Sequence, residues 1–179
     1  MEESMMGDMD MMDQMGEMSD SRLEEGEEFH VLKLAIKNKV NHEVQIPEKL
    51  SVIKPIDVSA AEERFIPLSL SMGMMGGGGQ QMMQWLIDGN TFDMYSYPIQ
   101  VNRNRTEVWS IFNSEQSMPH PMHIHGYHFQ VIERLNSPPQ IRRLAVEAKG
   151  RIPTDLGWKD TVLVWPGETV RIAIDFSTR

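Results

Sequence analysis

Four of the six histidines in the chain lie within nine positions, in the stretch MPHPMHIHGYHF. They are His120, His123, His125 and His128. Histidine is the commonest metal ligand because its neutral imidazole offers a lone pair near neutral pH. The sequence contains no cysteine, which excludes thiolate sites, iron–sulfur clusters and disulfides. This density of imidazoles predicts a metal site with nitrogen, oxygen or thioether ligands.

The spacing of His123 and His125 suits one face of a β-strand. Alternate side chains of a strand share a face, and a rise of about 3.3 Å per residue places these two side chains about 6.5 Å apart. Ile124 then faces the opposite side, into a core. Pro121 lacks a backbone donor, which places the segment at a sheet edge or at the start of a strand. His120 is therefore expected on a loop at the rim.

The other polar and aromatic candidates indicate less chemistry. His128 is expected to be a structural residue, or one that supports a ligand, rather than a ligand itself. Asp160 is expected to accept a structural hydrogen bond, and a role in orienting a metal-bound histidine stays open. Trp109, Trp158 and Trp165 are expected to pack in the core or a hairpin. No Ser/His/Asp triad or phosphate-binding loop is evident in the sequence.

The elements that must position the histidines have the pattern of short strands. Turn signals rich in glycine, proline and asparagine separate the apolar stretches ERFIPLSLSM, WLIDGNTF, TEVWSIFN, HIHGYHFQVIER, KDTVLVW and ETVRIAIDF. Long helical periodicity is absent. The sequence therefore predicts an all-β fold, an antiparallel β-sandwich or barrel.

Three regions are predicted along the chain. Residues 1–28 hold eleven acidic residues, one basic residue and eight methionines, and are expected to be a disordered segment. Residues 29–59 are expected to form a strand, FHVLKLAIK, and a linker that contains proline. Residues 60–179 are expected to form the folded domain, with a flexible Met- and Gly-rich insertion at 71–84. The apolar strand at the end of the sequence suggests an incomplete fold.

Composition narrows the classes of partner. The formal net charge is -9, but acidic and basic residues nearly balance outside residues 1–28. No basic stripe with interleaved aromatics is present, which argues against nucleic acid. No apolar run approaches the ~18 residues of a membrane span, and the N-terminus lacks the layout of a signal peptide.

Two classes of metal protein suit a His-x-His pair on a strand. A cupin-type site needs a glutamate a few residues after the pair and a further histidine after a Pro-x-Gly turn. Phe129 and Gln130 stand in the first place, and no histidine follows the Pro166-Gly167 turn. The cupin interpretation fails on both counts, which leaves copper.

HPMHIHG resembles the His-Pro-x-His-x-His-Gly motif of the last cupredoxin domain of multicopper oxidases, the family of laccases, bilirubin oxidases and cuprous oxidases. WLIDGNTFDM, RTEVWSIFN and GWKDTVLVWPGETVRIAIDF resemble the strands around that motif. The resemblance covers roughly Glu62 to Arg179. FHVLKLAIK and IPEKL resemble the last strand of the preceding domain and the linker out of it. The resemblance implies a cupredoxin-like Greek-key β-sandwich or barrel and copper as cofactor.

By this resemblance, His120 matches the ligand of the type 1 copper, which takes electrons from the substrate. His123 matches a ligand of the type 2 copper and His125 a ligand of a type 3 copper, and these coppers reduce dioxygen to water. The family completes the sites with a His-Cys-His-x-x-x-His-x-x-x-x-Met segment and with histidine pairs of the first domain. The sequence contains neither, so we expect a fragment truncated before the His-Cys-His segment. No catalytic residue can be assigned in this chain alone.

Met-rich runs such as MMGDMDMMDQM resemble those of copper-resistance oxidases, and thioether sulfur is a soft ligand that suits Cu(I). They are expected to recruit copper, although the sequence assigns no single methionine as a ligand. The resemblance implies a periplasmic or otherwise exported parent in copper homeostasis. That parent oxidises Cu(I) or phenolic substrates, reduces dioxygen and contains further cupredoxin domains. Two alternatives stay open: a copper carrier without oxidase activity, and a copper-free cupredoxin scaffold.

Overall fold

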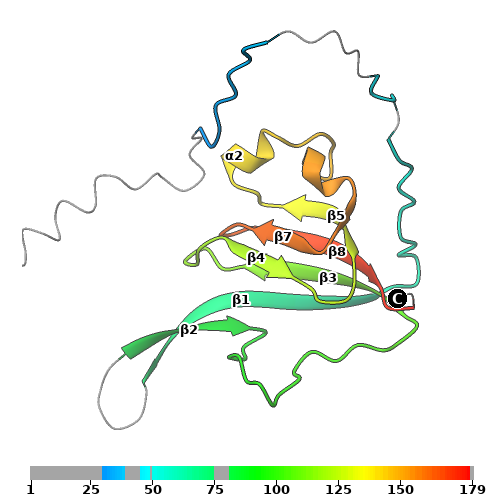
Figure 1. The fold of residues 1–179 in the computed structure, drawn as a ribbon. Coiled ribbons are helices and arrows are strands. Elements are labelled where there is room, and N and C mark those ends of the chain that lie inside the picture. Colours follow the sequence, from blue (N-terminus) through cyan, green and yellow to red (C-terminus); the bar gives the residue numbers. More distant parts are fainter. Residues whose placement is uncertain (1–29, 39–44, 49, 75–80, 178–179) are drawn as a thin grey trace, which may run out of the picture. The chain divides into compact units, whose positions relative to one another are not determined.

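The computed structural model describes residues 30–38, 45–48, 50–74 and 81–177 of the chain (Figure 1). The chain divides into two units, Met1–Ile46 and Pro47–Arg179. In the first unit, the described residues have no regular secondary structure. The predicted disordered segment 1–28 lies outside the described residues. Within the described ranges, no helix is long and apolar enough to cross a membrane.

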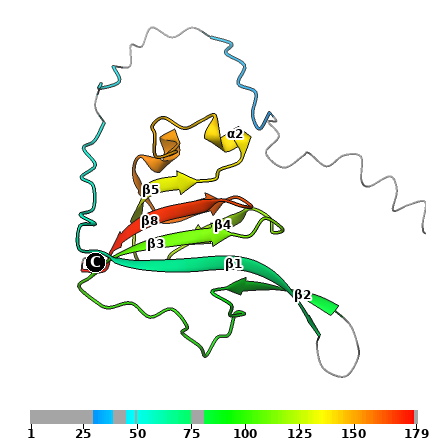
Figure 2. The ribbon, with the colours of Figure 1, turned by 180° about the vertical axis from the view of Figure 1, so that it is seen from behind.

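The regular secondary structure of the second unit is almost entirely β-strand (Figures 1 and 2). Its strands are β1 (Glu62–Met74), β2 (Gln81–Ile87), β3 (Thr106–Asn113), β4 (His120–His123), β5 (Phe129–Leu135), β6 (Trp158–Lys159), β7 (Thr161–Val164) and β8 (Thr169–Asp175). The helices in the described part are a short α-helix, α2 (Pro139–Arg142), and a 3₁₀ turn (Pro153–Asp155). The prediction of an all-β fold is confirmed.

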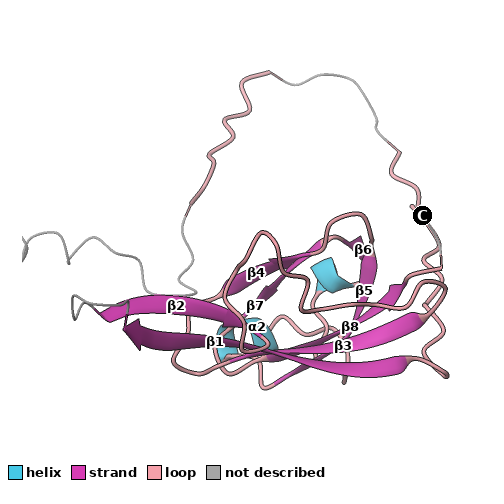
Figure 3. Cartoon of the chain, turned by 90° about the horizontal axis from the view of Figure 1, so that it is seen from below, coloured by secondary structure: helices cyan, strands magenta, loops and turns pink. Residues whose placement is uncertain are grey.

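Six strands form one sheet in the order β2-β1-β3-β8-β5-β6, and β4 and β7 form a second sheet. Figure 3 shows the pair β4 and β7 on one side of the larger sheet. Neighbouring strands are antiparallel except β1 and β3, which are parallel. The prediction of a purely antiparallel sheet is wrong for this one pair. Residues 88–105 return the chain from β2 to the starting end of β1, and a long crossover of this kind makes a parallel pair possible.

The core fills the space between the two sheets. In β8, the alternate residues Val170, Ile172 and Ile174 are fully buried, because side chains of a strand alternate between its faces. β7 contributes Val162 and Val164 from the smaller sheet by the same rule. The core cluster contains Ile66, Leu68, Trp109, Ile111, Phe129, Val131, Val162, Val164, Val170, Ile172, Ile174 and Phe176. β4, the strand that carries His120 and His123, is thus held against the core by its partner strand β7.

The strand predicted at FHVLKLAIK is not formed in the structure. Residues 30–38 have no regular secondary structure, and Val31, Leu34 and Ile36 are largely exposed. A strand needs a neighbour to pair its backbone N–H and C=O groups. No described strand pairs with this segment. The assignment of residues 29–59 to a preceding domain and a linker stays a prediction.

The segment predicted as a flexible insertion, residues 71–84, partly belongs to the larger sheet. β1 and β2 pair from Leu68 opposite Ile87 to Met74 opposite Gln81. Residues 71–74 and 81–84 are therefore the arms of a β-hairpin. The four consecutive glycines at 76–79 lie outside the described residues.

The strand predicted from HIHGYHFQVIER divides into two strands that belong to different sheets. β4 ends at His123 and pairs with β7, whereas β5 begins at Phe129 and pairs with β8. Gly126 has φ of 82°, in the left-handed region that favours glycine. The chain thus crosses between the sheets at this point, and three of the clustered histidines lie at or beside the crossing.

Gly150 packs against the backbone of β5, and its replacement by alanine is expected to lower the free energy of unfolding by about 2 kcal/mol. Its φ is +72°, and an added Cβ would lie 2.7 Å from the carbonyl oxygen of Arg134. Urea denaturation measures the loss. Gly157→Ala is the matched control, because a Cβ at Gly157 meets nothing within 4 Å. Equal losses in the two variants would contradict the steric explanation.

Candidate metal centre

β4 directs its two histidines to opposite sides. Residues three apart in a strand face opposite ways because side chains alternate. His120 is accordingly half-buried, whereas His123 is exposed. His120 lies opposite Val164 of β7, and His123 lies opposite Thr161. One short strand therefore presents its imidazoles in two different environments.

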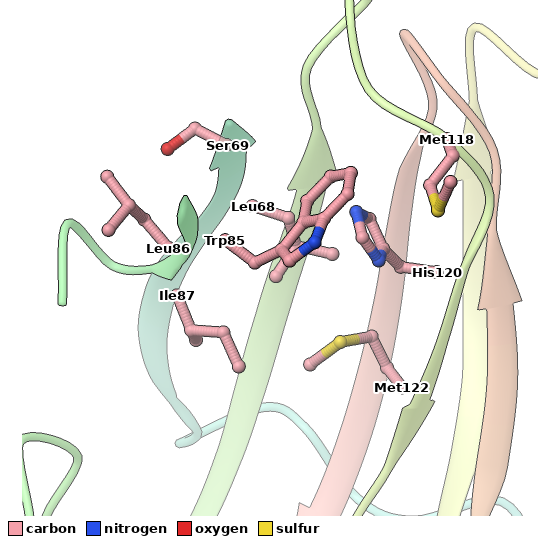
Figure 4. A pocket seen from close by; sticks show the side chains of 8 residues that line it. All are labelled: Leu68, Ser69, Trp85, Leu86, Ile87, Met118, His120 and Met122. Carbon is pink, nitrogen blue, oxygen red and sulfur yellow. The ribbon is translucent and has the colours of Figure 1, made fainter. Parts of the chain in front are cut away.

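His120 lines a pocket of about 260 Å³ between β4 and the β1–β2 hairpin (Figure 4). The Trp85 indole meets the imidazole edge-on, with ring centroids 5.0 Å apart. Met118 and Met122 flank His120 in sequence and line the same pocket (Figure 4). No charged side chain is among the lining residues. An imidazole and two thioethers in apolar surroundings form a soft donor set that suits copper, above all Cu(I).

The environment of His120 favours its neutral form. Burial lowers the pKa of His120, because the charged imidazolium is the form that desolvation penalises. Its Nε2 lies 2.8 Å from the Ser117 hydroxyl oxygen. Neutral imidazole is the form that binds a metal. The ring is therefore in the correct protonation state for a ligand and is held by one hydrogen bond.

His123 and His125 meet edge to face, with ring centroids 4.7 Å apart. β4 ends at His123, so the two residues do not share a regular strand as predicted, but the sequence correctly places the two side chains close together. Both are exposed. His123 Nδ1 lies 2.9 Å from the backbone carbonyl oxygen of Asp160 and 2.9 Å from Thr161 Oγ1. Two adjacent, accessible imidazoles can bind one metal or two neighbouring metals.

The described residues supply only part of a coordination shell. Within them, no group of three or more His, Cys, Asp or Glu side chains could hold a metal ion. Protein sites for copper and zinc commonly use three or four protein ligands. His120, His123 and His125 have the donor chemistry for copper, so further imidazole, thiolate or carboxylate ligands would have to come from outside the described residues.

The remaining histidines are not in this arrangement. His128 is exposed just before β5. His30 is exposed in the first unit, and His42 lies outside the described residues. The predicted acceptor at Asp160 is a backbone carbonyl rather than the carboxylate. In the described ranges, the ring contacts and hydrogen bonds of the predicted trio include no further histidine.

Sequence reasoning missed the residues around His120. Met118 and Met122 stand two positions on either side of it, and this alternate spacing could have indicated a shared face. Trp85 belongs to a different hairpin, and nothing in the local sequence connects it with His120. Ser117 has no such signal either, because a serine three residues before a histidine is an ordinary occurrence.

Asn113 supports the histidine segment from the core. This residue is fully buried at the end of β3. Its Nδ2 donates to the carbonyl oxygen of Met118 at 2.8 Å and to that of Val164 at 3.0 Å. Met118 lies just before β4, and Val164 pairs with His120. Asn113 therefore connects both backbone segments that flank His120.

A buried ion network continues from Asn113. The Asn113 N–H donates to the carbonyl oxygen of Glu168 at 3.0 Å. The Glu168 carboxylate accepts the Trp165 N–H at 2.9 Å and Arg134 Nη1 at 3.0 Å. Arg134 also bonds Asp155 through Nε, at 2.6 Å. The network fixes the β7–β8 turn, and β7 in turn positions β4.

Sequence comparison matches residues 67–179 to the family described as "Multicopper oxidase". The chain is 30% identical over 133 residues to a laccase of Haloferax volcanii, a match that covers 73% of this chain and 20% of the relative. It is 36% identical over 81 residues to a laccase of Bacillus subtilis, which covers 40% of this chain and 15% of that protein. The chain thus spans about a fifth or less of these relatives.

Solved structures show the same fold. The McoA multicopper oxidase of Aquifex aeolicus is 35% identical with a TM-score of 0.55, and the match covers 78% of this chain and 28% of that chain. A Campylobacter jejuni multicopper oxidase described as a metallo-oxidase has a TM-score of 0.55 at 23% identity, over 77% of this chain and 29% of its own, which shows the fold alone. The predicted cupredoxin-like β-sandwich is confirmed.

Proposed function

We propose a function from the premise that this chain belongs to the multicopper oxidase family, whose members use copper. In the proposal, the chain binds copper through His120, His123 and His125. The observation that carries it is the placement of the imidazoles. His120 lies in a pocket with two thioethers, and the rings of His123 and His125 lie 4.7 Å apart on the exposed side.

The three histidines have distinct roles in this proposal. His120 is a ligand of the type 1 copper, His123 of the type 2 copper and His125 of a type 3 copper. The opposite facing of His120 and His123 supports this division, because one short strand then serves two metal sites. Bound copper would supply one-electron redox chemistry, and the chain's own residues favour the neutral form of His120 and surround it with mostly apolar side chains.

The activity of the whole protein is part of the proposal, because the chain spans about a fifth of its curated relatives. We propose an oxidase that couples oxidation of Cu(I) or phenolic substrates to reduction of dioxygen to water. Met118 and Met122 beside His120 support Cu(I) as a substrate, since thioethers bind it well. Phenolic substrates are proposed from the resemblance to laccases, the name that two matched relatives carry. A periplasmic or otherwise exported location and further cupredoxin domains complete the proposal by resemblance.

Titration of the purified chain with Cu(I) against a chromophoric competitor tests copper binding. The double variant His123→Ala with His125→Ala is expected to lower the apparent Cu(I) affinity by more than about tenfold, since even the loss of a residue that only orients a ligand costs that much. His128→Ala is the matched control, because His128 is another exposed histidine of the same stretch. It is expected to leave the affinity unchanged.

The outcomes separate three kinds of protein. Absence of any Cu(I) binding would overturn the proposal and favour a copper-free scaffold. Binding by the full-length protein without dioxygen consumption would favour a copper carrier. Dioxygen consumption by the full-length protein in the presence of Cu(I), lost in the double variant, would support the oxidase.

A further inference from the structure

We propose that Ser117 and Thr161 are positioning residues that decide which ring nitrogen a neighbouring histidine offers to copper. Ser117 directs His120 to bind through Nδ1. Thr161, together with the carbonyl of Asp160, directs His123 to bind through Nε2. The inference rests on the proposed function, because it concerns the same two histidines, and it adds the groups that orient them.

The hydrogen bonds of His123 determine its tautomer. The carbonyl oxygen of Asp160, 2.9 Å from Nδ1, can only accept a hydrogen bond, so Nδ1 must carry the proton. The same carbonyl accepts the Ile124 N–H at 3.0 Å, which holds the oxygen in place. The lone pair for a metal is then on Nε2, at the tip of an exposed ring.

Thr161 restrains the orientation of the same ring. Its Oγ1 lies 2.9 Å from His123 Nδ1, and the two residues are direct partners across β4 and β7. A β-branched side chain in a strand has few rotamers, so this oxygen is held beside the ring. Two oxygens next to Nδ1 leave the ring little freedom to rotate that nitrogen outward.

His120 has the opposite arrangement. Its Nε2 is the nitrogen with a partner, the Ser117 hydroxyl at 2.8 Å. Ser117 is itself held in a turn by its N–H, which donates to the carbonyl of Ser114 at 3.1 Å. No hydrogen bond to His120 Nδ1 occurs among the described residues. A hydroxyl can donate or accept a hydrogen bond. In the proposal, Ser117 accepts the Nε2 proton, which leaves the Nδ1 lone pair for a metal.

The two nitrogen assignments explain how the pairs Ser117 with His120 and Thr161 with His123 can serve two different copper sites. Nδ1 is the ring nitrogen nearer the backbone, so His120 would hold its metal close to β4, in the apolar pocket. Nε2 is at the tip of the imidazole, so His123 reaches outward. A hydrogen bond on the other ring nitrogen fixes the tautomer and orientation of a metal-bound histidine.

NMR spectroscopy of the ¹⁵N-labelled chain tests the inference, because long-range ¹H–¹⁵N spectra distinguish protonated, unprotonated and metal-bound imidazole nitrogens. In the metal-free chain, His123 is expected to carry its proton on Nδ1. Addition of Cu(I), which is diamagnetic, is expected to shift Nδ1 of His120 and Nε2 of His123. The opposite assignment for either ring would overturn the inference for that histidine.

Paired variants separate the hydroxyl groups from the space that they fill. Ser117→Ala is expected to lower Cu(I) affinity about tenfold and to allow binding through Nε2 of His120, whereas Ser117→Thr keeps the hydroxyl and the wild-type spectrum. Thr161→Val is expected to broaden or shift the ring signals of His123, and Thr161→Ser to restore them. The backbone amide spectrum shows that each variant is folded.

Two results distinguish failure of this inference from failure of the proposed function. If Ser117→Ala binds Cu(I) through Nδ1 of His120 with unchanged affinity, Ser117 is not a positioning residue although the chain binds copper. If the chain binds no Cu(I), the proposed function fails and the role of Ser117 fails with it. The tautomer of His123 and its response to Thr161→Val are still read in the metal-free chain.

Discussion

Replacement of Arg134 by methionine is expected to lower the free energy of unfolding by about 3–5 kcal/mol, the usual effect of breaking a buried ion pair. The Arg134 side chain is 4% exposed, and its partners Asp155 and Glu168 are 1% and 0% exposed. The variant leaves two buried carboxylates without a counter-charge, which is costly in a medium of low polarity. Urea denaturation followed by tryptophan fluorescence measures the loss.

Arg171→Met is the matched control, because Arg171 also bonds two carboxylates but at the surface. Its Nη1 lies 2.8 Å from Glu133 and its Nη2 lies 2.9 Å from Glu63, with the arginine side chain 29% exposed. Water and salt screen such pairs, so the loss is expected to be below about 1 kcal/mol. A loss at Arg134 no larger than the loss at Arg171 would show that burial of the network does not determine its contribution.

Local sequence pattern predicted the strands of this fold but not their partners. TEVWSIFN and ETVRIAIDF are correctly predicted as strands because apolar alternation is a property of neighbouring residues. The parallel pairing of Glu62–Leu68 with Glu107–Asn113 depends on a crossover between distant segments. FHVLKLAIK has a strand pattern, but its residues 30–37 have no partner among the described strands, because a strand also needs a neighbour that local propensity does not supply.

In the candidate site too, contacts between residues close in sequence were predictable, whereas contacts between distant segments were not. The His-x-His spacing was sufficient to bring His123 and His125 together, since residues two apart stay close in any extended chain. The contact between Trp85 and His120 forms only when the β1–β2 hairpin packs beside β4. Asn113 looks like an ordinary residue at a strand end, and its role emerges from the two carbonyls that it reaches.

Replacement of Asn113 by alanine is expected to lower the free energy of unfolding by about 3 kcal/mol. The variant removes the Nδ2 donor from the Met118 and Val164 carbonyl oxygens. Each buried polar group that is left unpaired costs about 1–3 kcal/mol. The wild-type Oδ1 has no partner among the described residues, so the side chain contributes through its donor atom. Urea denaturation measures the global loss, and hydrogen exchange of the backbone amides of Met118, His120, Met122 and His123 is expected to accelerate.

Asn113→Asp tests whether the donor is what matters, because aspartate keeps the shape of asparagine and replaces Nδ2 by oxygen. An ionised carboxylate would place negative charge against two carbonyl oxygens in the core, so the loss is expected to be at least as large as for alanine. Asn102→Ala is the control for an exposed asparagine and is expected to change the stability by less than about 0.5 kcal/mol. If the aspartate variant is as stable as the wild type, the two hydrogen bonds do not hold the His120 segment, and the packing of Met122 and Val164 must do so instead.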